Sequence, residues 1–245
     1  ILESYDKEDI LLAFDIDLTL TVPDEPAVQI PYLKKYHVLL QKIILDLNND
    51  QEFLLFSIAT KKPPQILIDV KIPSIIKKLQ KKGIKIIALS SSITGALGSI
   101  KRVEEWRYNA LKKVGIVFNL SFPQITDLIL TDIVSYRDQH PVFYQGILCT
   151  NSQKKIKGKT LMVFLKKIDY SPKIIILVDD QKENLNEMYE AIKQSNSDIE
   201  FLGIEYNVGK QFTSANISEQ EFIAYWLNIV KSNHELLSPR RKTCQ

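Results

Sequence analysis

Short apolar runs alternate with segments of helical periodicity along most of this chain. Runs of strand length, rich in aliphatic residues, occupy residues 11–14, 84–89, 174–178 and 201–206. Helical spacing of apolar residues predicts helices over 33–47, 73–83, 100–114, 160–168 and 183–195, and a last one that begins after Ser218. This βαβ rhythm is typical of a doubly wound, Rossmann-like parallel sheet, so the fold class we expect is α/β.

Three stretches depart from that rhythm. Residues 48–50 are polar and predict the end of the first helix, after which 53–59 and 66–70 favour short extended segments. Residues 116–150 contain strand-like pieces at 116–118, 128–130 and 142–148 that are joined by polar turns. This pattern predicts a small β-rich insertion over the carboxyl edge of the sheet, either a cap or a small hairpin unit. We therefore expect a catalytic domain over residues 1–215 that carries this insertion, and a C-terminal helix with a basic tail over residues 216–245.

Composition argues against several classes of protein. The charged content of 25% and the net charge of +3 are ordinary, and basic residues alternate with apolar ones, so we expect no nucleic-acid ligand. The two cysteines lie far apart and the three histidines form no cluster, which disfavours a disulfide framework and a zinc site. No apolar run has membrane-spanning length. Because the chain begins with Ile1, we expect that a native amino-terminal segment precedes it.

Polar residues that could take part in catalysis or ligand binding lie at four places, each at the end of an apolar run or the start of a helix. In chain order they are Asp15-x-Asp17-x-Thr19, Ser90, Lys157-Gly158 and Asp179-Asp180. The carboxyl ends of parallel strands line the crevice in which open α/β sheets bind ligands. Two close carboxylates repel one another unless a cation or a shared proton relieves them. Each group taken alone also suits a structural role, as a turn residue or a helix cap, and it is their joint order that favours a site.

This set of residue types suits phosphoryl transfer. A carboxylate can attack phosphorus and form a phospho-aspartate, and a neighbouring carboxyl group can protonate the leaving alcohol and then activate water. A lysine and a divalent cation would neutralise the repulsion between carboxylate and phosphate, and a serine hydroxyl would hold a phosphoryl oxygen. The first and last places supply the hard oxygen ligands that Mg²⁺ prefers.

The ordered set resembles the haloacid dehalogenase (HAD)-like phosphatase superfamily over about residues 8–206. The segments DIDLT, IIALS, KG at a helix start and IIILVDD are similar to its four motifs. The resemblance implies that Asp15 is the nucleophile and a metal ligand. It also implies that Asp17 is the general acid and base, with a backbone carbonyl that binds Mg²⁺.

For the remaining motif residues, the resemblance implies that Ser90 and Lys157 hold the phosphate and that Asp179 binds the metal. Asp180 would support the metal indirectly, as a partner of the ligands or through water. Lys154, Lys155 and Lys159 compete with Lys157 for the phosphate, and Lys157 is preferred because Gly158 follows it at a helix start.

A narrower resemblance connects two segments, DVKIPSIIKKLQKKGIKIIALSSS and LVDDQKENL, to the uncharacterised DUF2608 group of HAD-like proteins. These proteins occur in intracellular bacteria of the Legionella and Coxiella type, which implies a soluble protein of the bacterial cytoplasm or one secreted into a host cell as an effector. Where many HAD relatives have an arginine shortly after the second motif, this chain has Ser91 and Ser92. Any substrate contact made by that arginine is therefore not expected here.

The function we expect is Mg²⁺-dependent hydrolysis of phosphate monoesters through a phospho-aspartate. A phosphotransferase or mutase, and a catalytically silent binding or scaffold protein, stay open as alternatives. Because no long helical lid is evident, a weakly covered site favours a large substrate, and a phosphotyrosine side chain is the first expectation. The sequence leaves membrane-surface association and the oligomeric state open.

Overall fold

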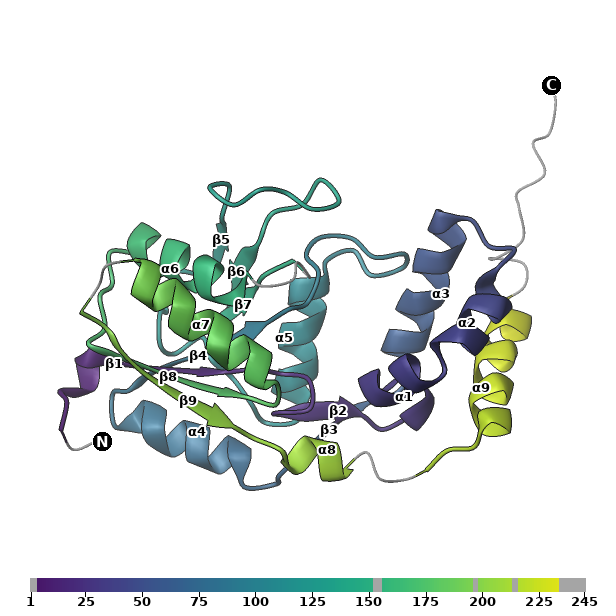
Figure 1. Cartoon of the computed structure of the whole chain (residues 1–245), viewed down its shortest axis with the longest axis horizontal. Coiled ribbons are helices and arrows are strands. Elements are labelled where there is room, and N and C mark those ends of the chain that lie inside the picture. The colour runs from purple at the N-terminus through teal and green to yellow at the C-terminus, as the bar shows by residue number, and fades with distance from the viewer. Residues whose placement is uncertain (1–3, 152–155, 196–197, 213–215, 234–245) are drawn as a thin grey trace. The chain divides into compact units, whose positions relative to one another are not determined.

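A computed structural model describes residues 4–151, 156–195, 198–212 and 216–233 and divides the chain into two compact units (Figure 1). The first unit contains residues 1–22, 65–95 and 102–212, and the second contains residues 23–64, 96–101 and 213–245. The expected boundary at residue 215 differs from this division, in which the chain leaves the first unit after Val22 and returns at Gln65. The expected basic tail, Lys154 and Lys155 lie outside the described residues.

The first unit is built on a mixed, mostly parallel sheet of seven strands in the order β5-β6-β7-β4-β1-β8-β9. Strands β4, β1, β8 and β9 run parallel, and β7 extends them parallel to β4, whereas β6 is antiparallel to both of its neighbours. The strands of this sheet are β1 (Ile10–Phe14), β4 (Lys85–Ser90), β5 (Asp127–Ile129), β6 (Val142–Tyr144), β7 (Ile147–Cys149), β8 (Ile174–Asp179) and β9 (Glu200–Glu205). The α/β class expected from the sequence is confirmed at this level.

Helices cover both faces of the sheet because successive side chains of a strand point to opposite faces. Leu11 and Ala13 of β1 pack with residues of α6 (Lys157–Lys167) and α7 (Lys182–Gln194). Ile10 and Leu12 pack on the other face with residues of α4 (Ile72–Lys81) and α5 (Val103–Lys113). A strand that is buried on both faces must be apolar at every position, which is why β1 and β8 are continuous aliphatic runs.

Two expectations for the sheet unit need correction. Residues 116–150 were expected to form a cap or a small hairpin unit over the carboxyl edge, and β6 and β7 do form a hairpin, but with β5 they extend the central sheet beyond β4. Residues 116–118 form no strand, and the expected strand over 142–148 is a hairpin of β6 and β7 that turns at Gln145-Gly146. The unit also contains a small second sheet of β2 (Thr21–Pro23) and β3 (Gln65–Leu67), and the short helix α8 (Val208–Phe212).

The second unit is helical, and sequence reasoning missed it. It contains α1 (Ile30–Lys35), α2 (His37–Ile44), α3 (Asn49–Lys61) and α9 (Glu219–Ser232) around a core that includes Leu55, Phe222 and Trp226. The expected strand over 53–59 is wrong, because this segment lies inside α3, and the single helix expected over 33–47 is broken into α1 and α2 at Tyr36. The polar residues at 48–50 begin a helix rather than end one, since Asn48 and Gln51 form a capping box.

Among the helices of the described residues, none combines the length and the apolar character needed to cross a membrane.

Candidate functional site

The candidate site begins where β1 ends, at the middle of the sheet. Asp15 follows the last residue of β1, and its backbone N–H donates to the carbonyl of Val178 at 2.9 Å, which ties it to the end of β8. Because β4, β1 and β8 are parallel neighbours, the residues that follow them meet at one edge of the sheet. Ser90, Asp15 and Asp179 are therefore brought to the same carboxyl edge, as the spacing of the motifs predicted.

A buried lysine joins two of these carboxylates. Lys157 Nζ donates to Asp15 Oδ1 at 2.6 Å and to Asp179 Oδ2 at 2.7 Å. The exposed fractions of the three side chains are 4% for Lys157, 8% for Asp15 and 0% for Asp179. Groups buried to this extent are seldom charged unless they are paired, so the three side chains depend on one another.

The start of α6 holds Lys157 in place. Glu187 of α7 accepts hydrogen bonds from the backbone N–H of Gly158 at 3.0 Å with both of its carboxylate oxygens, and so caps the first turn of α6. A Cβ atom on Gly158 would lie 2.5 Å from the Cβ of Ala191, so the two helices can approach this closely only with glycine there. Lys159, the alternative phosphate ligand among the described residues, is exposed to solvent.

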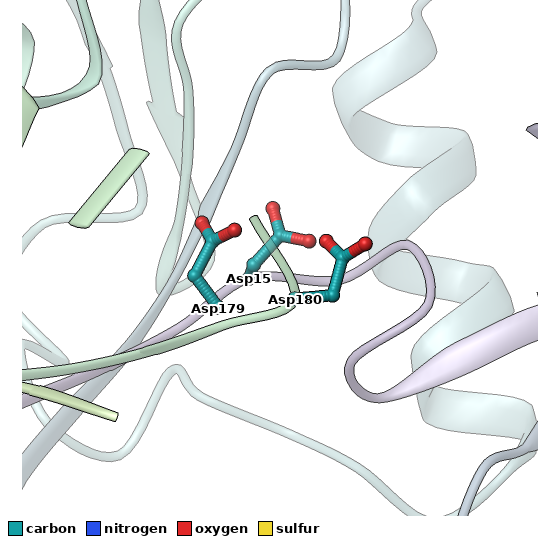
Figure 2. A group of neighbouring side chains, drawn as sticks. All are labelled: Asp15, Asp179 and Asp180. Carbon is teal, nitrogen blue, oxygen red and sulfur yellow. The ribbon is translucent and has the colours of Figure 1, made fainter. Parts of the chain in front are cut away.

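Three carboxylates gather at the edge of the sheet (Figure 2). Oxygen atoms of Asp15, Asp179 and Asp180 all lie within 4.8 Å of one another, and each residue is buried. The backbone N–H of Gln181 and the side-chain amide of Asn184 hold Asp179 at 2.9 Å. Asp180 Oδ1 is buried without a hydrogen-bond partner among the described residues. An unpaired buried carboxylate oxygen beside two further carboxylates fits a cation with a preference for oxygen ligands.

The electrostatics of this cluster also favour an additional cation. Burial raises the pKa of Asp15 to about 7, and repulsion from Asp179 and Asp17 adds to this, although Lys157 opposes it. Burial and the charge of Asp179 raise the pKa of Asp180 as well. The pKa of Lys157 is raised because the attraction of Asp15 and Asp179 outweighs the opposing effect of burial. The raised pKa values of Asp15, Asp180 and Lys157 all oppose the negative form of the cluster, which is the behaviour of a site with an excess of negative charge.

Asp17 has a different partner. Arg107 of α5 donates from Nη1 to Asp17 Oδ1 at 2.8 Å and from Nη2 to Asp17 Oδ2 at 2.7 Å, a bidentate ion pair. Asp17 lies in a tight turn in which the backbone N–H of Leu18 donates to the carbonyl of Thr21, with Leu18 at a positive φ of 65°. This turn directs the Asp17 side chain towards α5 while Asp15 stays with Lys157.

Arg107 also reaches the end of β4. Its Nε donates to Ser92 Oγ at 2.9 Å, and Ser92 Oγ lies 2.8 Å from Ser90 Oγ. The expected phosphate ligand Ser90 is therefore connected to Asp17 through Ser92 and Arg107. The candidate site consists of two hydrogen-bonded groups, one of Asp15, Lys157 and Asp179 and the other of Asp17 and its partners.

The structure brings the predicted residues Asp15, Asp17, Ser90, Lys157, Asp179 and Asp180 to one region, together with two residues that were not predicted. Arg107 and Ser92 were not identified as site residues, and the indirect part expected for Asp180 stays a prediction, although its carboxylate lies with those of Asp15 and Asp179. A signal for Arg107 was present, because Val103 and Leu111 lie four residues before and after it and both are buried. The backbone carbonyl of Asp17 as a metal ligand stays a prediction.

Comparison with known proteins identifies relatives but no activity. The profile of the family described as "Protein of unknown function (DUF2608)" matches residues 2–227. An "Uncharacterized protein" of Rickettsia bellii (strain RML369-C) is 30% identical over 218 residues, which cover 84% of this chain and 71% of that protein.

Two further relatives are matched over shorter segments. An "Uncharacterized protein" of Rickettsia felis (strain ATCC VR-1525 / URRWXCal2) is 30% identical over 64% of this chain and 51% of its own length. The "Uncharacterized protein RP295" of Rickettsia prowazekii (strain Madrid E) is 33% identical over 55% of this chain and 45% of its own length. The chain therefore spans about half the length of these two proteins.

Proposed function

This chain belongs to the DUF2608 family, whose function is unknown, and from its site we propose that it is a Mg²⁺-dependent phosphatase of the HAD type. It would hydrolyse phosphate monoesters through a covalent phospho-aspartate on Asp15. The observation that carries this proposal is the contact of Lys157 with both Asp15 and Asp179 at the carboxyl edge of a parallel sheet. A nucleophilic carboxylate needs a cation beside it if an anionic phosphate is to approach, and Lys157 provides one.

The cluster of aspartates fits a divalent cation. Asp15, Asp179 and Asp180 offer hard oxygen ligands, and Asp180 Oδ1 lacks another partner among the described residues. Together with Asp17, four carboxylates stand near three cationic side chains among the described residues, since Lys157 and Arg107 form ion pairs here and the charge of Lys210 also acts on Asp180. A bound Mg²⁺ would supply the missing positive charge and would lower the repulsion between the phosphate and the carboxylates.

In the first step, an oxygen of Asp15 forms a bond to phosphorus, and the bond from phosphorus to the ester oxygen breaks. Asp17 gives a proton to the departing alcohol. In the second step, Asp17 takes a proton from water, the water oxygen bonds to phosphorus, and the bond to Asp15 breaks. The products are an alcohol and inorganic phosphate, and Asp15 is regenerated.

Ser90 and Lys157 would hold the phosphoryl oxygens during both steps. Each side chain comes from a different element, the end of β4 and the first turn of α6, and each is buried. A hydroxyl and an ammonium fixed before the substrate arrives stabilise charge without reorganisation.

The substrate class stays a prediction. A phosphotyrosine side chain is the first candidate, because no long helical lid was evident from the sequence and a weakly covered site suits a large substrate. Small phosphate esters are the alternative, so the assay includes both classes.

The test is a screen of phosphotyrosine and phosphoserine peptides, sugar phosphates and nucleotides with Mg²⁺, for the wild type and Asp15→Asn. The proposal expects phosphate release by the wild type and almost none by Asp15→Asn, because an amide cannot attack phosphorus. Asp132→Asn is the control, since it makes the same change at an exposed carboxylate bonded to Lys167. Turnover retained by a folded Asp15→Asn protein would refute the assignment of Asp15 as the nucleophile. Transfer of phosphate to an added alcohol in place of water would indicate a phosphotransferase.

A further inference from the structure

We propose that Arg107 is a positioning residue that holds the carboxylate of Asp17 in its working orientation, anchored through Ser92 to the end of β4. The inference rests on the proposed function, because it assigns Arg107 an effect on the group that transfers protons. The motif segments of the sequence do not include this arginine. Its contact with Asp17 joins residues 90 positions apart in the chain.

The geometry of the pair is restrictive. Two parallel hydrogen bonds of 2.8 and 2.7 Å fix both oxygens of Asp17 against the planar guanidinium. The exposed fractions of the side chains are 15% for Arg107 and 25% for Asp17, so water competes little for the contact. The ammonium of a lysine would leave the carboxylate free to rotate, whereas the paired N–H groups of a guanidinium fix its orientation.

The guanidinium of Arg107 is itself held in place by a further hydrogen bond, to Ser92. Arg107 Nε donates to Ser92 Oγ at 2.9 Å, and Ser92 is bonded to Ser90 Oγ at 2.8 Å. The backbone N–H of Asn151 donates to the carbonyl of Ser92, which attaches this segment to the end of β7 as well. Arg107 thus joins three elements, the β1 turn, the segment after β4 and helix α5. Movement of any one of them would displace the Asp17 carboxylate.

The pair is compatible with proton transfer by Asp17. An ionised carboxylate has about four lone-pair sites, and the two bonds from Arg107 use one on each oxygen. One of the remaining sites carries the proton that Asp17 gives to the leaving alcohol in the first step and that it takes back from water in the second. Arg107 transfers no proton in this scheme and sets only the direction of the Asp17 oxygens.

The main alternative is that Arg107 binds the phosphate itself. The two assignments predict different kinetics, because loss of a substrate contact weakens binding, whereas misdirection of Asp17 slows the chemical step. They also predict different dependence on the leaving group, since a basic alkoxide needs a proton and an activated phenolate hardly does.

The experiment measures kcat and KM for wild type, Arg107→Met and Arg107→Lys on an alkyl phosphate and a nitrophenyl phosphate, in the presence of Mg²⁺. Arg107→Met should lower kcat on the alkyl ester about 100-fold, the cost of a misplaced catalytic group, and change KM little. The loss of kcat on the nitrophenyl ester should be smaller. Arg107→Lys restores the positive charge without the bidentate contact, so it should recover part of the kcat that Arg107→Met loses on the alkyl ester. Arg102→Met is the matched control, because Arg102 precedes α5 and forms its own ion pairs with Glu104 and Asp127.

A double-mutant cycle with Asp17→Asn decides the mechanism. If Arg107 acts through Asp17, then Arg107→Met has almost no further effect on kcat once Asp17 is Asn. Additive losses, or a raised KM with an unchanged kcat, would overturn the proposal and assign Arg107 to substrate binding. Equal losses on both esters would overturn it as well, and would leave Arg107 a structural residue.

A stability measurement on the four proteins of this cycle (wild type, Arg107→Met, Asp17→Asn and the double variant) distinguishes failure of this inference from failure of the proposed function. The midpoint of urea unfolding should show coupling between Arg107 and Asp17, so that the double variant loses less than the two single losses together. Independent losses would overturn the pairing whether or not the protein has any activity. Absence of phosphate release by the wild type would overturn the proposed function and leave the coupling measurement valid.

Discussion

The contact of Lys157 with two buried carboxylates can be tested by removing its charge. Lys157→Met keeps the apolar stem and the approximate length of the side chain but leaves Asp15 and Asp179 without their shared cation. All three side chains are at least nine-tenths buried, with Nζ at 2.6 and 2.7 Å from the two oxygens. Loss of one partner of a buried ion pair costs about 3–5 kcal/mol, because the remaining charge has neither water nor a counter-ion.

The assay is urea unfolding followed by circular dichroism at pH 8, in EDTA and in Mg²⁺. This pH lies above the raised pKa of Asp15, about 7, so the Asp15 carboxylate is ionised in the metal-free wild type. We expect the unfolding free energy of Lys157→Met in EDTA to fall by about 3–5 kcal/mol. We also expect Mg²⁺ to restore more stability to this variant than to the wild type, since a cation bound only by the folded state stabilises it by mass action.

Lys159→Met is the matched control, two residues further along α6, where the side chain is exposed. Its unfolding free energy should stay within about 0.5 kcal/mol of the wild type, as for other surface substitutions. If Lys157→Met is as stable as this control in EDTA, then the buried charge cluster does not exist in solution and the reasoning fails.

Three further predictions address the metal, the α6–α7 contact and the buried thiol. Asp179→Asn should abolish the rise in melting temperature that Mg²⁺ gives the wild type, and Asp180→Asn should reduce it as well; an undiminished rise in Asp179→Asn would contradict the proposed ligands. Gly158→Ala should lower the unfolding free energy by about 1–3 kcal/mol through overpacking against Ala191, despite the better helix propensity of alanine, and a stabilised variant would refute the close approach. Burial raises the pKa of Cys149 to about 12, so its thiol stays protonated at pH 8 and, in a Cys244→Ser background, should react with Ellman's reagent only after unfolding. Fast reaction of the folded protein would show that β7 is open to solvent.

The carboxyl-edge residues could be predicted from sequence because their positions depend on local patterns. Asp15 and Asp179 each complete or follow an aliphatic run, and parallel strands place such residues at one edge whatever the details of packing. The start of α6 was predicted in the same way from Lys157-Gly158, although the closeness of Ala191 that requires the glycine was not visible.

Residues whose importance depends on contacts far along the chain could not be predicted. The spacing of Val103 and Leu111 places Arg107 on the buried face of its helix, but only the packing of α5 shows that its guanidinium reaches Asp17. The apolar segment at 53–59 has strand-like composition, but its helix is decided by the Asn48 cap and by packing against Trp226. Likewise β7 pairs with β4 rather than forming part of a separate cap, a non-local choice that no short pattern reveals.

The central claim is that Asp15 attacks phosphorus, and the most direct measurement is to trap the product of that attack. Wild type, Asp15→Asn and Asp17→Asn are each mixed with a nitrophenyl phosphate and Mg²⁺, quenched in acid within one turnover, and digested for mass spectrometry. The account predicts one phosphoryl group, labile to hydroxylamine as an acyl phosphate is, on the peptide that contains Asp15 in the wild type. Asp17→Asn should accumulate more of this species, because water attack loses its base, and Asp15→Asn should contain none. Rapid turnover without any trapped phosphate in Asp17→Asn, or phosphate on another residue, would contradict the account.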